Sequence, residues 1–211
     1  VDEDVNTLRC PFTILKPLGI PRVNAVLPGE QLPGFFYFYP AMETLIPDEI
    51  FPVVDEEGNE ISKAPRSVCH DGKSMLLHPV VHLHLFNSRS ELCLQKRALT
   101  KDLLPGYWDS SAGGHINPGE TPSGALKRET YEELGLTDIN TRFLGRYIWE
   151  SSREREFVWS FTGVSDATPV FNEDEIEEGR FWTMEEIRNK IGKDVFTPNF
   201  EHEFRMFLEN L

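Results

Sequence analysis

The chain has few cysteines and no long apolar segment. Its 211 residues include only Cys10, Cys69 and Cys93, an odd number without paired spacing. This pattern supports neither a disulfide framework nor a zinc ribbon, and it favours a reducing, cytoplasmic setting. No apolar run approaches the roughly 20 residues that span a bilayer, and the start VDEDVNTLRC lacks the charged-then-apolar pattern of a signal peptide. We therefore expect no membrane partner.

Basic residues are also scarce. The chain has 21 lysines and arginines against 35 aspartates and glutamates, which gives a formal net charge of −14. Such an acidic balance disfavours a nucleic-acid backbone or an anionic membrane as the main partner. A phosphorylated substrate must therefore be attracted locally, by metal ions and a few basic side chains.

The composition changes near residue 50 and predicts two regions. Residues 1–48 contain seven prolines, which break any long helix or strand, so we expect an irregular extension. Its one strand-like piece is GFFYFY at residues 34–39, which is too aromatic to remain in water. We expect this piece to lie on the main domain or on a second subunit of a homodimer. Residues 49–211 are predicted to form the main domain.

Alternating and helical patterns predict the elements of the main domain. We expect a hairpin around the FPVVDEEGNE segment, two paired strands over residues 76–86 and 91–99, and a helix over 122–134 that Gly135 caps. We further expect an antiparallel pair over 141–150 and 156–164, a short helix over 185–191, a strand over 194–197 and a terminal helix over 200–210.

A dense run of glutamates on the predicted helix over 122–134 carries the clearest functional signal. Positions three and four apart share a helix face, so Glu129, Glu132 and Glu133 would lie along one stripe. Three like charges on one stripe repel each other unless cations lie among them. Mg²⁺ is bound by a few carboxylate oxygens together with substrate phosphates, so the stripe predicts a metal site. The alternative is a solvated acidic face, in which Arg128 is only a surface partner of a glutamate.

The spacing over residues 114–136 resembles the Nudix box of pyrophosphohydrolases. Gly114 is followed after five residues by Glu120, and after seven more by the segment RETYEELGL. The resemblance implies an α/β/α sandwich with a mixed sheet, Mg²⁺ or Mn²⁺ as cofactor, and Arg128 as the group that orients a box glutamate. It also makes the backbone carbonyl of Gly113 a candidate metal ligand. Thr130 departs from the pattern, which has a bulky aliphatic residue there, so we expect a looser helix face.

A narrower resemblance, to the isopentenyl diphosphate isomerase-like branch, spans about residues 51–190. It rests on CHDGKSMLLH, on LHLFNSRSELCLQKRALTKDLLPGYWDSSAGGH, and on the shorter REREF and GRFW. The branch implies a second metal site, and the matching residues are His70, His78, His115, Glu154 and Glu156. Imidazole and carboxylate together bind Mn²⁺ or Zn²⁺ as well as Mg²⁺. The alternative is that these histidines are hydrogen-bonded core groups, which is our expectation for His82 and His84.

Basic and aromatic residues complete the predicted site. Arg97 and Lys101 match positions that hold diphosphate oxygens in the isomerase, and Arg66 is a third candidate, although each also fits a solvated surface. Trp108 and Trp182 fit either a substrate wall or the core.

One departure from the isomerase decides the expected reaction. Gly113 stands where the isomerase has its acid–base cysteine, while all three box glutamates are present. We therefore expect metal-dependent hydrolysis of a small-molecule diphosphate, such as a nucleoside diphosphate derivative, with Glu133 or the Glu154/Glu156 pair as base. Two alternatives stay open: an isomerase-like enzyme that protonates prenyl diphosphates through Glu154 or Glu156, and a non-catalytic Nudix module that binds a metabolite or a protein.

Overall fold

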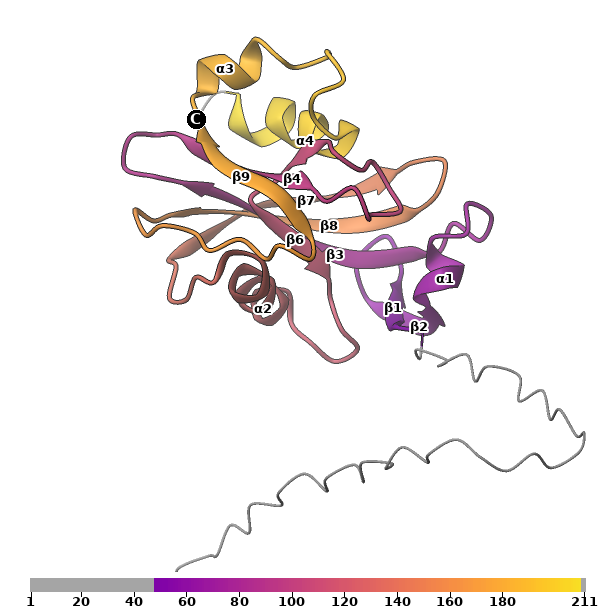
Figure 1. Ribbon diagram of the computed structural model, residues 1–211. Helices are drawn as coiled ribbons and strands as arrows, with labels where there is room; N and C mark the ends of the chain where they lie inside the picture. Colours follow the sequence, from indigo (N-terminus) through magenta and orange to yellow (C-terminus); the bar gives the residue numbers. More distant parts are fainter. Residues whose placement is uncertain (1–47, 210–211) are drawn as a thin grey trace, which may run out of the picture. The chain divides into compact units, whose positions relative to one another are not determined.

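The computed structural model describes residues 48–209, which form two sheets and several short helices (Figure 1). The predicted GFFYFY segment and the rest of the extension up to residue 47 lie outside the described residues. An antiparallel hairpin consists of β1 (Ile50–Val54) and β2 (Glu60–Pro65), as the sequence predicted. The larger sheet contains β3 (Leu77–Phe86), β4 (Leu92–Arg97), β5 (Trp108–Asp109), β6 (Ala112–His115), β7 (Thr141–Glu150), β8 (Arg155–Val164) and β9 (Ile176–Trp182). The helices are α1 (Arg66–Cys69), α2 (Pro122–Leu134), α3 (Met184–Arg188) and α4 (Pro198–Glu203).

The larger sheet is mixed, because β3 and β8 are parallel while the other neighbours are antiparallel. The expected β7–β8 pair is confirmed. The expected β3–β4 pair is confirmed only at the turn, where Phe86 faces Leu92, because β6 occupies the rest of that edge of β3. Strand β4 instead pairs along its length with β9, a strand that the sequence patterns did not reveal.

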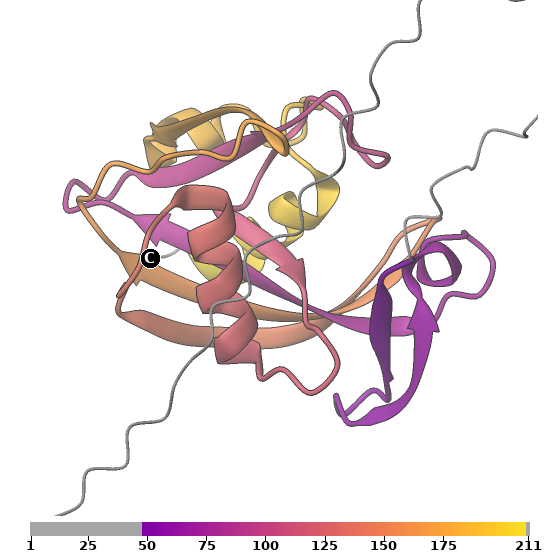
Figure 2. The same ribbon diagram turned by 60° about the horizontal axis from the view of Figure 1, so that its bottom comes forward.

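The two faces of the sheet carry separate apolar cores. Val81, Leu83 and Leu85 point from β3 toward α2 and pack there with Leu126 and Leu134. On the opposite face, Phe86 of β3 joins a cluster that includes residues of α3 and α4. Figures 1 and 2 show α2 on one side of the sheet and α3 with α4 on the other. The predicted α/β/α sandwich is therefore confirmed.

Local signals explain the bounds of α2. The Thr121 hydroxyl accepts a hydrogen bond from the Gly124 amide at 3.1 Å, and a proline follows at the first helical position. Gly135 ends the helix with φ of 63°, a conformation that glycine adopts without strain. Thr130 is buried, and its hydroxyl donates to the Leu126 carbonyl at 2.6 Å. The threonine is thus accommodated within the helix itself.

The C-terminal part differs most from the sequence prediction. Helix α3 is shorter than expected, and the predicted strand over 194–197 is only a single bridge from Phe196 to Trp108. Helix α4 begins two residues earlier than predicted, because Thr197 caps it by accepting from the Phe200 amide at 3.2 Å. It then continues as a π-helix over Phe204–Leu208. Within residues 48–209, no helix has the length and apolar character needed to cross a bilayer.

Candidate active site

A cavity of about 760 Å³ opens among β3, β4, β6, α2 and the start of α4. All the predicted site residues line it except His78, which is fully buried but lies directly behind His70. The cavity therefore brings together segments that are far apart in the sequence. These residues form two groups. The box group consists of Glu129, Glu132 and Glu133 on α2. The histidine group lies at the start of β3 and consists of His70, His78, His115, Glu154 and Glu156.

Within the box group, Glu133 is the most deeply buried member. Its Oε2 accepts hydrogen bonds from the Gly113 amide and from Nε2 of Gln95, both at 3.0 Å. Burial and the nearby charge of Glu129 raise the pKa of Glu133 to about 8. Burial disfavours the ionised form of this carboxylate, so a cation that binds beside it would stabilise that form strongly.

Glu129 lies against the glycine turn that precedes α2. A Cβ atom at Gly114 would stand only 2.2 Å from Oε1 of Glu129, so any larger residue there would displace the Glu129 carboxylate. Burial raises the pKa of Glu129 as well. Glu132, in contrast, has a side chain that is 51% exposed. The solvent exposure of the predicted stripe therefore increases from the buried Glu133 to the solvent-facing Glu132.

Arg128 joins the parts of the box group. Its guanidinium donates to Glu129 at 2.6 Å, to Glu132 at 3.1 Å and to Glu120 at 2.9 Å. It also donates to the His115 carbonyl at 2.9 Å, which links the box to the histidine group. This geometry agrees with the predicted orienting role. It also keeps Glu129 and Glu132 paired within the protein.

The histidine group consists of side chains whose donor atoms converge. Nε2 of His70 lies 3.3 Å from Nε2 of His78 and 3.2 Å from Nε2 of His115. The three ligand atoms lie within 4.8 Å of one another, as do those of His78, Glu154 and Glu156. Among residues 48–209, these are the two sets of three that meet so closely, and neither includes a box glutamate.

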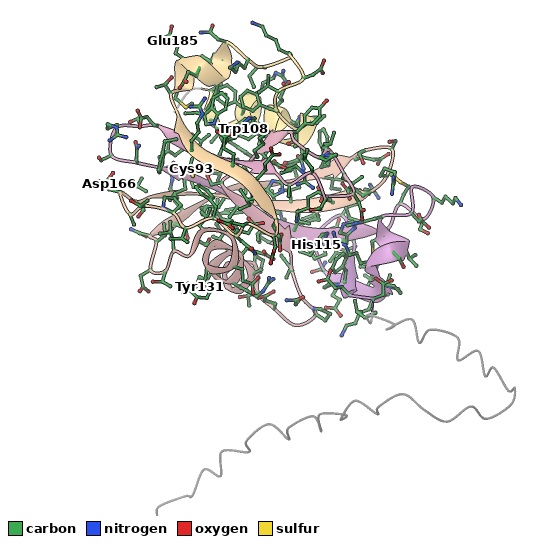
Figure 3. All side chains as sticks on the ribbon, in the orientation of Figure 1. Cys93, Trp108, His115, Tyr131, Asp166 and Glu185 are labelled. Atoms are coloured by element: carbon green, nitrogen blue, oxygen red, sulfur yellow. The ribbon has the colours of Figure 1, made fainter. Side chains whose placement is uncertain are left out.

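Distant strands assemble this group. The parallel register of β3 and β8 places His78 directly beside Glu156. The hairpin β1–β2 supplies Phe51, whose ring stacks on His115 with centroids 3.9 Å apart and an interplanar angle of 11°. Helix α1 follows the hairpin and leads to His70. Figure 3 shows His115 where β3 approaches the hairpin and α1.

The protonation states of the histidine group suit metal binding. Burial lowers the pKa of His70 to about 4 and also lowers the pKa of His78 and His115, so the three imidazoles are neutral near pH 7. Neutral imidazole is the form that binds metals. Burial, together with Glu154, raises the pKa of Glu156 to about 8. Three imidazoles and two carboxylates fit Mn²⁺ or Zn²⁺ as well as Mg²⁺.

The predicted basic residues lie around the cavity and are already paired. Arg97 donates to Asp109 at 3.2 Å, and Lys101 forms an ion pair with Glu175 at 2.7 Å. The Arg66 guanidinium lies 5.6 Å from the Phe51 ring centroid, a cation–π contact. Trp108 and Trp182, which fitted either a wall or the core, are both buried in the core beside α3 and α4.

Sequence reasoning missed the contribution of α4. Asn199 donates to Oε2 of Glu156 at 3.1 Å, and its own Oδ1 accepts from the Tyr147 hydroxyl at 2.5 Å. Glu203, at the end of α4, accepts from Nδ1 of His82 at 2.9 Å. His84 is a buried core group as expected, whereas His82 lines the cavity. The Thr-Pro start of α4 could have signalled a helix there, but nothing in the sequence links it to β3.

The family model of the NUDIX domain matches residues 76–200, which include the box group and most of the histidine group. The chain belongs to the Nudix family. It is similar to an uncharacterized Nudix hydrolase of Pseudomonas aeruginosa, with 33% identity over 76% of this chain and 94% of that protein. It is also similar to the isopentenyl-diphosphate Delta-isomerase of Streptomyces griseus, with 34% identity over 70% of this chain and 78% of the relative.

Solved structures of Nudix and MutT proteins share the fold. A protein from Deinococcus radiodurans has a TM-score of 0.66 and 26% identity, and the match covers 75% of this chain and 99% of that one. The MutT protein of Methanosarcina mazei has a TM-score of 0.55 and 23% identity over 64% of this chain and 94% of its own. The Nudix fold predicted from the box is thus confirmed.

Proposed function

We propose that this Nudix protein is a metal-dependent hydrolase that cleaves the diphosphate linkage of a small molecule, such as a nucleoside diphosphate derivative. The observation that supports this most strongly is the pairing of a complete box group with a glycine at position 113. The carboxylates needed for hydrolysis are present, and the side chain needed for a thiol-based proton transfer is absent. The cavity of about 760 Å³ suits a metabolite rather than a polymer.

The box glutamates have assigned roles in this proposal. Glu132 and Glu133 would hold Mg²⁺ or Mn²⁺, with the Gly113 carbonyl as a further ligand, and Glu129 would help to bind the metal or orient the attacking water. When bound, the metal activates water and neutralises charge on the departing phosphate. Both hydrogen bonds of Glu133 end on Oε2, so its Oε1 is the candidate acceptor for the proton of the attacking water. Glu156 is the alternative base.

The remaining residues bind and orient. Arg97 and Lys101 bind oxygens of the diphosphate by releasing Asp109 and Glu175, and Arg66 does so by releasing Glu49, to which it donates at 3.1 Å. Arg128 keeps Glu129 in place through its 2.6 Å contact. Glu154 and Glu156 with the three histidines would hold a second metal ion, since they lie beside the cavity that the box group lines.

Isomerisation of a prenyl diphosphate is the second candidate, and the histidine group favours it. Against it, a Cβ atom at Gly113 would lie 2.9 Å from Cδ2 of His82 and 3.1 Å from the Val81 carbonyl. A side chain of any size at this position needs the neighbours to move. Proton transfer would therefore have to come from Glu154 or Glu156.

A substrate panel with product masses tests both candidates. The purified protein is incubated with nucleotide, sugar-nucleotide, dinucleotide and prenyl diphosphates, each with Mg²⁺ or Mn²⁺. Cleavage at the diphosphate supports the hydrolase and names its substrate class. Conversion of isopentenyl diphosphate without a change of mass supports the isomerase instead, and the absence of turnover across the panel supports a binding module.

A further inference from the structure

Glu203 is a buried carboxylate that belongs to neither the box group nor the histidine group. Its side chain is 0% exposed, and its Oε2 lies 2.9 Å from Nδ1 of His82 and 3.2 Å from Nε2 of His84. A buried carboxylate loses much solvation energy unless hydrogen bonds and opposite charge compensate for it. Here a hydrogen bond from His82 provides the compensation, and the ring of His84 lies close by. Of these two histidines on β3, only His82 lines the cavity.

The ring of His82 is fixed between α4 and Gly113 of strand β6. Its Nδ1 donates to Glu203, while its Cδ2 faces Gly113 closely enough to leave no room for a Cβ atom there. Among the described residues, Nε2 of His82 has no hydrogen-bond partner. The Gly113 amide donates to Glu133, and Glu156 lies near enough to act on the charge of His82. His82 therefore lies between the box group and the histidine group.

We propose that His82 is a catalytic residue, which donates a hydrogen bond from Nε2 to an oxygen of the bound diphosphate, and that Glu203 is the positioning residue that fixes its ring. This inference rests on the proposed function, because it needs a diphosphate in the cavity. It assigns to His82 a role that neither the box nor the histidine group includes.

The charges around His82 support this assignment. The ion pair with a fully buried carboxylate favours the imidazolium, in which both ring nitrogens are donors. The imidazolium loses solvation on burial, and the 2.9 Å contact with the Glu203 carboxylate offsets this loss. Asp109 is already paired with Arg97, so it does not occupy Nε2. A fixed donor aimed at developing phosphate charge contributes about 10²–10³-fold in kcat in comparable sites.

Two conservative variants separate a catalytic role from a structural one. His82→Asn keeps an amide near Nδ1, so Glu203 stays paired while the donor into the cavity is lost. His82→Gln places its amide near the Nε2 position, so the cavity keeps a donor while Glu203 loses a partner. If His82 only stabilised Glu203, Asn would be the better replacement. The proposal requires the opposite order.

The experiment measures kcat and KM with the cleaved diphosphate, and calorimetric binding of magnesium methylenediphosphonate, at one fixed pH. We expect His82→Asn to lower kcat about 100-fold and His82→Gln about tenfold or less. The same order is expected for the binding constants. Equal or better performance of His82→Asn in both assays would overturn the proposal.

The two assays also distinguish the failure of the proposed function from the failure of this inference. If the wild type cleaves no diphosphate, the proposed function fails, and the order of the binding constants alone decides the role of His82. If the wild type neither cleaves nor binds the analogue, both fail. Thermal melting of each variant verifies that it folds.

A third variant tests the role of Glu203. Measured alone, it does not depend on the folding of the His82 variants, and an unchanged kcat in it would overturn the positioning role of Glu203. Glu203→Gln keeps the size of the side chain and removes its charge. We expect a decrease in kcat of about tenfold in the wild type and no further decrease when it is combined with His82→Asn. An independent decrease in the double variant would show that Glu203 does not act through His82.

Discussion

The box group and the histidine group lie in one cavity, but they are organised in opposite ways. In the box group, Arg128, Gln95 and the Gly113 amide already satisfy the carboxylates. In the histidine group, three imidazole nitrogens converge within 4.8 Å, and the Nε2 atom of His70 lies within 3.5 Å of the Nε2 atoms of both other histidines and of a Glu154 oxygen. One group is held together by the protein, whereas the other needs an additional ion to use its donor atoms.

This difference shows that a recognisable sequence motif and a preformed metal geometry are separate properties. The box has the stronger motif, yet its glutamates do not converge, because Arg128 binds two of them. The histidine group has loose spacing in the sequence, yet its geometry is ready. We infer that the histidine group binds the first metal ion and that the box group is completed when metal and substrate arrive together. The predictions below test this contrast.

The largest expected effect is on turnover, through the box group. Glu133→Gln removes the most buried box carboxylate and should lower kcat at least about 100-fold, because the variant loses both a metal ligand and a candidate base. Steady-state kinetics with Mg²⁺ measures it. Glu185→Gln, an exposed glutamate on α3 far from the cavity (Figure 3), is the matched control and should retain activity. Full activity of Glu133→Gln would remove the box from the mechanism.

The next effect is on metal affinity, through the histidine group. His78→Ala should weaken the first Mn²⁺ bound to the substrate-free protein by at least about tenfold, since a ligand at the centre of both convergent sets is removed. Calorimetric titration measures this affinity. His202→Ala removes a histidine outside the cavity and should leave it unchanged. If Glu133→Gln weakens the first ion more than His78→Ala does, the order of filling inferred above is wrong.

A smaller effect is expected on stability at the point where the two groups meet. Gly113→Ala places a methyl group 2.9 Å from Cδ2 of His82 and should cost about 1–3 kcal/mol of unfolding free energy. Urea unfolding measures the cost. In a His82→Ala background, most of the penalty should disappear because the ring is gone. An equal penalty in both backgrounds would place the strain at the Val81 carbonyl instead.

The smallest effect is on the stability of the metal-free protein and depends on pH. The pKa of Glu133 is about 8 in the folded protein, above the 4.5 of a solvated glutamate, so the folded state binds more protons between these values. Its contribution to stability is present below about pH 4.5 and is lost as pH rises through about 8. In a chelator at pH 8.5, Glu133→Gln should therefore melt about 2–4 °C higher than the wild type. The gain should shrink toward pH 5.5; an equal gain at both pH values would contradict the titration.

The sequence predicted the elements whose signals are local. Helix α2 has its Thr-Pro start and Gly135 end within the helix segment, and the hairpin β1–β2 carries its own turn. The box spacing likewise lies within one segment, so the family and the box glutamates could be predicted from the sequence. The three histidines and two glutamates of the histidine group were found by resemblance. The structure brings the three histidines together, and it brings His78 together with Glu154 and Glu156.

What the sequence could not predict depends on contacts between distant segments. Strand β9 owes its place to pairing with β4, and β3 loses most of its contact with β4 because β6 intervenes. The cavity position of His82 depends on Glu203, which is 121 residues away. In the LHLHLF pattern, His82 and His84 are equivalent, and only α4 and Gly113 distinguish them.

The parallel pairing of β3 with β8 also has a consequence for how the protein folds. His78 meets Glu156 only when two strands separated by more than 60 residues of intervening chain are aligned in one register. A shift by one residue would turn every side chain of the shifted strand to the other face, and the juxtaposition of His78 and Glu156 would be lost. Such long-range pairing slows folding, because the entropy of closing the intervening chain must be lost before the pairing stabilises it. His78 and Glu156 are therefore brought together by the slow, long-range part of folding rather than by any local segment.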